Sequence, residues 1–329
     1  DGEGRDPPPR PLPARRPRPS PEQPFYFFHL EKVGGTTLRE MIARGVRQHN
    51  LSAFIPCYRP AEQGEEGYGR AGGLVYDDHW RHCLQFGLDP ARLGAARRAG
   101  LAVVATHGDW NEWHNLPSVH SEDDLSCFVM LRHPVARVIS FYYERIYGLL
   151  TDQRLEDLSS EELSMFLETV GIAPAQGGSF DDDGMVVVKD EGLKDAGCRM
   201  LSGAYGRSGR RVPGGAAAAA AIGALPRPPY SAATAKRRLQ QCTVGILEEW
   251  DRTRAVLDYW FPWIDSSYQY KHHVLSHKGR ETAYTLPMSL YEVILQHNQC
   301  DLELFQYGVR LFETQIAFLS TLKKDHLLK

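Results

Sequence analysis

Three apolar runs of strand length constrain the fold of this chain more than any other feature of its sequence. They are FYFFHL at 25–30, LAVVAT at 101–106 and SCFVML at 126–131. Apolar residues follow one another in these runs instead of alternating with polar ones, which is typical of strands buried on both faces of a parallel sheet. With 329 residues the chain is long enough to bury a large core. We therefore expect an α/β fold with a central parallel sheet flanked by helices, in one domain spanning residues 25–329.

Helical patterns lie between and after these runs. Residues 36–48 carry apolar side chains at helical spacing, and further helices are expected at 231–241, at 248–260 and from Pro287 onward, with a short strand at 243–247. The expected core residues of the last helical region are Leu290, Val293, Ile294, Leu302, Leu304 and Phe305.

Two segments differ from the rest of the chain in composition. Residues 1–24 hold nine prolines and five arginines with almost no apolar residues, so this segment is expected to be a disordered stem. Residues 203–228 are rich in glycine, arginine and serine and then run into six alanines at 216–221, which is typical of a low-complexity insertion. We assign no function to the insertion.

Charge and cysteine content limit the class of partner. The formal net charge is −3 and the isoelectric point is near 6.5, so bulk electrostatics do not suggest a nucleic acid. Six cysteines are too widely spaced for a zinc ribbon or a thioredoxin motif, and they are compatible with disulfides without requiring them. No run of eighteen apolar residues occurs and the chain begins at Asp1, so a targeting or membrane segment is expected to be absent or already removed. Asn50 begins an N-glycosylation sequon, which only a secretory compartment would use.

The segment after the first apolar run has the residue types of an anion-binding loop. Lys32 is followed by Gly34, Gly35, Thr36 and Thr37, and a helical pattern begins at once. Successive backbone N–H groups and the positive end of the helix dipole would face an anion here, and Lys32 adds a mobile cation. The lysine precedes both glycines, so this is not a Walker A motif, in which it stands directly before the Ser or Thr. A strand–helix turn that uses glycine for backbone freedom is the competing interpretation.

Polar residues also follow the other two apolar runs. His107 directly follows the second run, and a histidine with a pKa of ~6.5 is suited to deprotonate a hydroxyl at neutral pH. Arg132 follows the third run, and Arg137 and Ser140 lie three residues apart on one face of the next helix, where they would grip a phosphate. A structural histidine, and arginines that only cover a helix surface, are the competing interpretations. Because the carboxyl ends of parallel strands share one edge of a sheet, Lys32, His107 and Arg132 are expected to lie at that edge.

Taken together, these stretches resemble the sulfotransferases that use 3′-phosphoadenosine 5′-phosphosulfate (PAPS), most closely the heparan sulfate 6-O-sulfotransferase branch of the carbohydrate enzymes. HLEKVGGTTL is similar to the family's 5′-phosphosulfate loop, THGDWNEW to its segment with the catalytic base, and LRHPVARVIS to its 3′-phosphate motif. CRML, AKRRLQQCTVGILEEW and HNQCDLELFQYGVRLF also resemble that branch, so the similarity covers residues 25–313. It implies a single sulfotransferase domain built on a P-loop-like central parallel sheet.

The resemblance implies a role for each of these residues. PAPS would be the co-substrate and 3′-phosphoadenosine 5′-phosphate (PAP) the product, and the reaction would need no metal. Lys32 would stabilise the charge that builds on the leaving 5′-phosphate, and His107 would take the proton from the acceptor hydroxyl as it attacks sulfur. The other cofactor-binding residues would be Gly34, Gly35, Thr36, Thr37 and Leu38 in the loop, Arg132 and Ser140 at the 3′-phosphate, and Arg137 and Arg199. Val33 and His133 stand where the family usually has threonine and aspartate.

The resemblance also implies a class of acceptor and a location. The acceptor would be a hydroxyl, most plausibly of a carbohydrate; a heparan-like glycan, another polysaccharide, a glycolipid and a small alcohol all remain open. The protein would be a glycoprotein of the Golgi lumen and would belong to a type II membrane protein whose N-terminal anchor has been removed. A Pro-rich stem and a sequon agree with this location.

Other function classes remain open on the sequence alone. A P-loop kinase shares the strand–loop–helix phosphate site, although the Walker lysine position is missing. A metal-dependent glycosyltransferase would use Asp77 and Asp78 or the acidic run at 181–183 as a manganese site, although such runs beside glycine are usually solvated loops. His272, His273 and His277 would form a further metal site, against which a surface or core role competes. A non-catalytic glycan-binding relative would not need Lys32 and His107.

Overall fold

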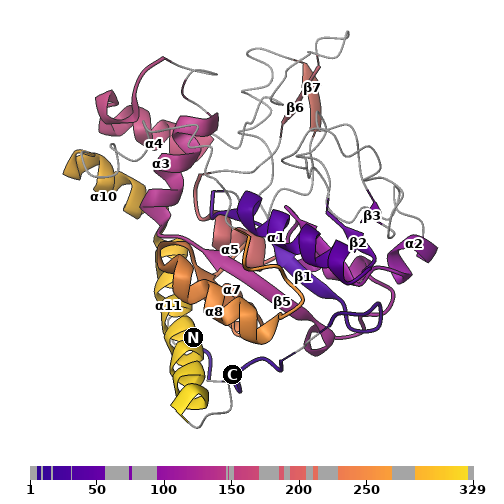
Figure 1. The fold of residues 1–329 in the computed structure, drawn as a ribbon. Helices are drawn as coiled ribbons and strands as arrows, with labels where there is room; N and C mark the ends of the chain where they lie inside the picture. The colour runs from indigo at the N-terminus through magenta and orange to yellow at the C-terminus, as the bar shows by residue number, and fades with distance from the viewer. Residues whose placement is uncertain are drawn as a thin grey trace.

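A parallel sheet surrounded by helices organises the described part of the chain, which comprises residues 6–8, 10–15, 18–30, 32–55, 74–75, 95–145, 147, 152–169, 185–188, 193–204, 210–213, 229–268 and 286–324 of the computed structural model. Five strands and a two-residue edge strand, β3, form this sheet in the order β3-β2-β4-β1-β5-β8 (Figure 1). All neighbouring pairs run parallel. The strands are β1 (Phe25–Phe28), β2 (Ala53–Phe54), β3 (Leu74–Val75), β4 (Val103–Thr106), β5 (Ser126–Leu131) and β8 (Thr243–Ile246). The expected α/β fold with a central parallel sheet is confirmed.

Helices connect the strands and cover the sheet. The α-helices are α1 (Gly35–Gln48), α2 (Ala95–Ala99), α3 (Pro134–Arg145), α4 (Ser160–Thr169), α5 (Ala196–Leu201), α7 (Ala232–Leu239), α8 (Trp250–Trp260), α10 (Met288–His297) and α11 (Gln299–Lys324). Short 3₁₀ turns are η2 (Trp110–Asn115), η3 (Glu122–Asp124), η4 (Leu155–Asp157) and η5 (Leu247–Glu249). A separate antiparallel pair consists of β6 (Met185–Val188) and β7 (Arg210–Pro213), the latter within the expected insertion.

The expected helical region after Pro287 divides in two at Asn298. The side chain of Asn298 is fully buried, its Nδ2 donates to Ile294 O at 3.0 Å, and its Oδ1 accepts from Asp195 N at 2.9 Å. An asparagine that binds nearby backbone groups competes with the helical ladder, so α10 ends there and α11 begins in a new direction. Of the core residues expected in this region, Leu290, Ile294 and Leu304 are at most 1% exposed.

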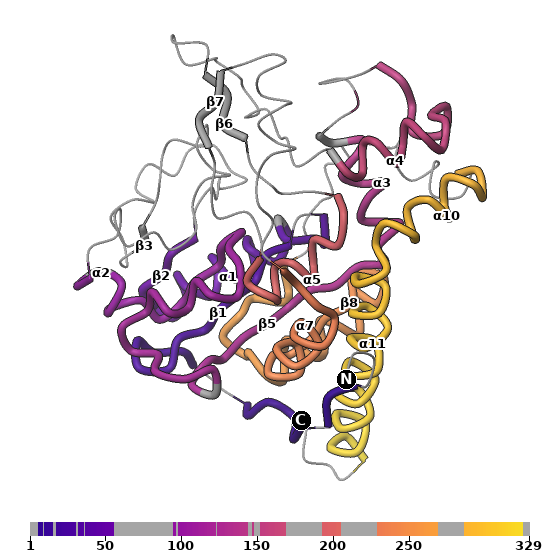
Figure 2. The backbone as a smooth tube through the Cα atoms, turned by 180° about the vertical axis from the view of Figure 1, so that it is seen from behind, coloured from indigo at the N-terminus to yellow at the C-terminus, as the bar shows by residue number. Residues whose placement is uncertain are grey.

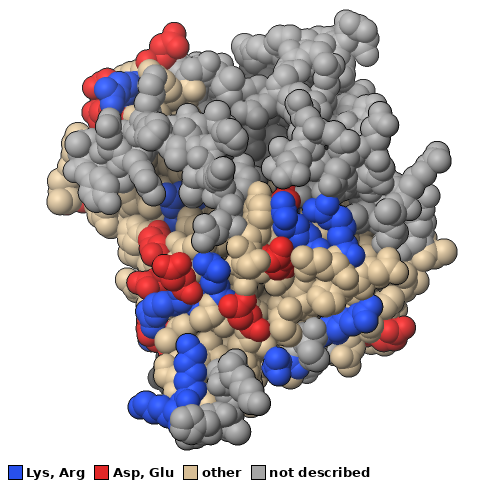
Figure 3. Space-filling model, in the orientation of Figure 1, with Lys and Arg blue, Asp and Glu red and all other residues tan. Residues whose placement is uncertain are grey.

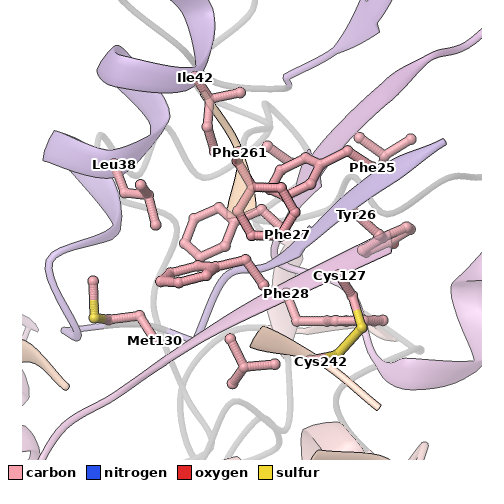
Figure 4. Packing of buried hydrophobic residues seen from close by; sticks show 14 of the residues in the cluster. Phe25, Tyr26, Phe27, Phe28, Leu38, Ile42, Cys127, Met130, Cys242 and Phe261 are labelled. Atoms are coloured by element: carbon pink, nitrogen blue, oxygen red, sulfur yellow. A yellow bond between two sulfur atoms is a disulfide. The ribbon is translucent and has the colours of Figure 1, made fainter. Parts of the chain in front are cut away.

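β1 forms the centre of the hydrophobic core. Its four consecutive side chains, Phe25 to Phe28, are each at most 1% exposed (Figure 4). The ring of Phe25 lies edge-on to Phe261 at 4.8 Å and to Trp263 at 5.1 Å between centroids. Both faces of β1 are therefore covered, which explains why its sequence is continuously apolar.

α11 covers the outer edge of the sheet beside β8. Gln315 on α11 accepts from Val244 N at 3.1 Å and donates to Val244 O at 3.0 Å, so its amide takes the place of a further strand. Gly308 lets α11 approach β5, because a Cβ at this position would lie 2.2 Å from Leu131 Cδ1. Figures 1 and 2 show α11 alongside this end of the sheet from both sides.

A second hydrophobic cluster joins α3, α4 and α10 at one end of the molecule (Figures 1 and 2). Leu155, Leu163, Leu290 and Ile294 are fully buried in this cluster. α3 begins directly after β5, so the cluster is attached to the sheet through the same loop that carries Arg132.

Two disulfides link elements that are far apart in the sequence. Cys127 on β5 is bonded to Cys242, the residue before β8, and Cys198 on α5 is bonded to Cys300 on α11. Cys57 and Cys83 lie outside the described residues. Disulfides persist in oxidising compartments, so the pairing suggests an extracellular or luminal domain. Within the described residues we find no helix with the length and apolar character of a membrane span.

The described residues of the N-terminal segment contact the domain. Arg15 Nε donates to Tyr259 O at 2.8 Å, and Trp260 Nε1 donates to Pro13 O at 2.8 Å. Asp6 forms ion pairs with Arg310 at 2.5 Å and with Lys236 at 3.1 Å. Backbone carbonyls, arginines and one carboxylate supply these contacts in a segment that is almost without apolar residues.

Charges of both signs are interspersed on the described surface of the face that Figure 3 shows. This pattern agrees with the small net charge of −3. A polyanion would therefore depend on a local group of cations and backbone donors, and not on a field across this face.

Candidate active site

β1 lies where the connections of the sheet change direction. From β1 the chain passes through α1 to β2 on one side, whereas from β5, on the other side of β1, it proceeds to β8. In open parallel sheets, ligands bind beyond the carboxyl ends of the strands at such a switch point. The loop after β1 contains Lys32 and the loop after β5 contains Arg132. The two predicted phosphate motifs therefore stand where this kind of sheet binds its ligands.

The backbone of the loop between β1 and α1 includes two left-handed residues. The φ angles are 66° at Lys32 and 80° at Gly34. Left-handed residues in a turn are typical of nests, in which successive N–H groups form a concave anion site. Lys32 lacks the freedom of glycine, so its conformation costs about 1–2 kcal/mol. Such strain is common where a loop binds a ligand.

α1 begins directly after this nest. Leu38 N donates to Gly34 O at 3.2 Å, so the amides of Gly35, Thr36 and Thr37 precede the first intrahelical hydrogen bond. The first turn of α1 holds no acidic residue. Its positive dipole end and its N–H groups can therefore serve an anion. Leu38 is fully buried, which leaves only its backbone for the predicted cofactor contact.

Arg132 joins the loop after β5 to the loop after β1. Its Nη1 donates to Lys32 O at 3.0 Å. Burial disfavours the charged guanidinium and lowers the pKa of Arg132; nearby Glu248 opposes this effect and Arg137 adds to it. Glu248 offsets only part of the cost of burying this charge, and a bound anion would offset more of it.

His107 follows β4 at the same edge of the sheet and contacts a second histidine. Its ring centroid lies 3.9 Å from that of His29, which follows β1. His107 is half-buried and its Nδ1 is buried. The predicted base thus lies one strand away from the predicted phosphate loop, as the sequence indicated. His29 was not predicted as a site residue, because in the sequence it looks like part of an apolar run.

A buried hydrogen-bond network supports the His107 loop. Tyr26 Oη donates to Glu112 Oε2 at 2.9 Å, and Thr106 Oγ1 donates to the same oxygen at 3.1 Å. Gly108 N donates to Thr106 Oγ1 at 3.2 Å, so the residues on both sides of His107 are anchored. Burial, and then the charge of Glu112, raise the pKa of Tyr26 well above its usual value. The network is therefore a hydrogen-bonded support that keeps its phenol protonated.

The other three predicted site residues lie farther along the helices. Arg137 on α3 is 2% exposed; its Nη2 donates to Leu193 O at 2.7 Å and lies 3.5 Å from Asp301 Oδ2. Arg199 on α5 is also 2% exposed and lies beside Lys194 O, at 3.5 Å from Nη1. Ser140 is half-exposed on α3. These contacts hold Arg137 at the junction of α3, α5 and α11, and its role at a cofactor stays a prediction.

The sequence positions suggested for a metal are not part of the described structure. Asp77, Asp78, the run 181–183 and the histidines at 272–277 all lie outside it. Among the described residues, no group of three or more His, Cys, Asp or Glu side chains is placed to hold a metal ion.

Comparisons with known proteins do not assign the chain to a family. No protein-family model matches the chain, and no curated protein matches it significantly.

Proposed function

We propose that this protein is a sulfotransferase that moves the sulfuryl group of PAPS to a hydroxyl acceptor, most plausibly on a carbohydrate. The observation that carries the proposal is the hydrogen bond from Arg132 to Lys32 O. This bond joins the loop after β1, which has the residue types of a 5′-phosphosulfate site, to the loop after β5, which has those of a 3′-phosphate site. Both loops lie at one edge of the sheet, and His107 follows the neighbouring strand β4.

The residues at this edge suit a ligand with two phosphate groups. The nest at Lys32 and Gly34 and the first amides of α1 would hold the 5′-phosphosulfate. Arg132, whose buried charge is only partly offset by Glu248, would meet the 3′-phosphate together with Ser140. Arg137 and Arg199 are weaker candidates for the cofactor, because their described contacts are within the fold.

The proposed chemistry is an in-line transfer at sulfur. The acceptor oxygen forms a bond to sulfur while the bond between sulfur and the 5′-phosphate oxygen breaks and PAP leaves. The acceptor proton passes to His107; because Nδ1 is buried, Nε2 is the nitrogen that receives it. Lys32 stabilises the negative charge that the leaving phosphate gains. Both reactants are charged or polar, so positioning and electrostatics supply most of the rate gain.

We further propose a location in the Golgi lumen. Two disulfides agree with an oxidising compartment, and the sequon at Asn50 is usable there.

Ligand-dependent thermal stability tests the proposal. A ligand that binds the native state raises the melting temperature by mass action, so 3′,5′-ADP, which is PAP, should raise it more than ADP or ATP at the same concentration. Equal shifts with all three nucleotides would contradict the proposal. A larger shift with ATP would favour a kinase-like phosphotransferase instead.

A further inference from the structure

His29 connects the proposed phosphate loop with the proposed base. It follows β1, and its backbone N donates to Thr106 O at 3.0 Å, directly beside His107. Its ring packs against that of His107 at 3.9 Å between centroids, tilted by 35°, and stacks with Phe27 at 5.4 Å. Only 6% of His29 is exposed. The imidazole of His107 therefore rests on a ring that is itself fixed by the core.

The loop is shaped around the His29 ring. A Cβ added at Gly35 would lie 1.5 Å from His29 Nε2 and 1.9 Å from Cδ2, both far inside van der Waals contact. Gly35 is the first residue of α1 and is not among the residues with a positive φ, so backbone freedom does not require glycine here. The absence of a side chain at Gly35 is needed because His29 occupies that space.

The charges around His29 oppose its protonation. Burial, followed by the nearby charges of His107, Arg39 and Lys32, holds the pKa of His29 well below its usual value. The positive end of α1 acts in the same direction, because Gly35 is the first residue of that helix. Its Nδ1 is buried and has no hydrogen-bond partner within the described residues. Protonation of the His29 ring is therefore disfavoured.

We propose that His29 is a neutral positioning residue that holds the imidazole of His107 for proton abstraction and does not exchange the proton itself. This inference rests on the proposed function, because it assigns His107 as the base. Gly35 then serves the base as well as the anion, because its missing side chain leaves room for the His29 ring, which His107 contacts.

Two substitutions separate positioning from proton transfer. His29→Gln keeps a planar polar group of similar length and cannot titrate near neutral pH, whereas His29→Ala removes the group. We expect His29→Gln to keep kcat within about threefold of the wild type with the same pH profile, and His29→Ala to lose about 10²-fold in kcat, the size of a small misplacement of a catalytic group. The KM for PAPS should change little in either variant. Melting temperatures with and without 3′,5′-ADP show that both variants fold and bind.

The outcomes distinguish this inference from the proposed function. If both variants lose activity equally and the acidic limb of the pH profile moves, His29 itself carries the proton and the inference is overturned. If both keep wild-type kcat, His29 has no positioning role. A wild type that transfers no sulfate contradicts the proposed function instead. In that case acylation of His107 by diethyl pyrocarbonate, followed by mass spectrometry, still decides the contact: we expect faster labelling in His29→Ala than in wild type and His29→Gln, and equal rates in all three would refute it.

Discussion

Replacing Gly35 by alanine should destabilise the protein because the new side chain collides with the ring of His29. The new Cβ would lie 1.5 Å from Nε2, 1.9 Å from Cδ2 and 2.4 Å from Cε1 of the His29 ring. No small adjustment relieves such distances, so the ring must leave its place beside His107 and Phe27. Overpacking of a buried site usually costs about 1–3 kcal/mol. Displacement of a whole buried ring places Gly35→Ala at the upper end of that range.

A double-mutant cycle isolates this contact. In a His29→Ala background the ring no longer fills the space beside Gly35. Gly35→Ala should then be neutral or stabilising by up to about 1 kcal/mol, because alanine has a higher helix propensity than glycine. The expected coupling between the two sites is therefore about 3 kcal/mol. Urea unfolding of the four proteins gives it as shifts in the midpoint at constant slope. Additivity within about 0.5 kcal/mol would refute the reasoning, because it would mean that the two side chains do not compete for space.

Three further predictions concern the anion edge, the buried carboxylates and a disulfide. Arg132→Ala should weaken 3′,5′-ADP binding by about 10–100-fold in calorimetric titrations, which is the usual contribution of a charge-assisted hydrogen bond. Arg252 is an exposed arginine paired with Glu313, so the control variant Arg252→Ala should leave the affinity unchanged. Burial, followed by nearby Asp301, raises the pKa of Asp195 above 3.8, so its contribution to stability is greatest below pH 3.8 and is lost as pH rises through the raised pKa. The unfolding free energy of the wild type minus that of Asp195→Asn should therefore fall as pH rises from 3.8 through the raised pKa. A difference that rises with pH would contradict the raised pKa. Substituting Cys198 and Cys300 together by alanine should cost about 2–5 kcal/mol of unfolding free energy, and no loss would mean that the pair is not bonded.

The sheet could be predicted because strands buried on both faces have a continuous apolar sequence. Runs at 25–30, 101–106 and 126–131 contain β1, β4 and β5, and the rule that parallel strands end at one edge placed Lys32 and Arg132 at neighbouring loops. The rule needs only chain order and strand direction, so no side-chain contact had to be known.

The rest depended on contacts between residues that are distant in the sequence. His29 looks like a polar end of an apolar run until β1 and β4 are paired and its ring meets His107. Helical spacing placed Arg137 and Ser140 on one face of α3, but the carboxylate that lies beside Arg137 comes from Asp301 on α11. The division of the last helical region at Asn298 likewise depends on a hydrogen bond from Asp195. Periodicity within one segment carries no information on such partners.

Transfer of labelled sulfate from PAPS to a panel of hydroxyl acceptors, by the wild type and by His107→Ala, tests the central claim most directly. We predict that the wild type labels at least one carbohydrate acceptor, and that His107→Ala loses about 10²–10⁴-fold in turnover, the usual worth of a general base, while its thermal shift with 3′,5′-ADP persists. No transfer by the wild type to any acceptor, or unchanged turnover in His107→Ala, would contradict the account.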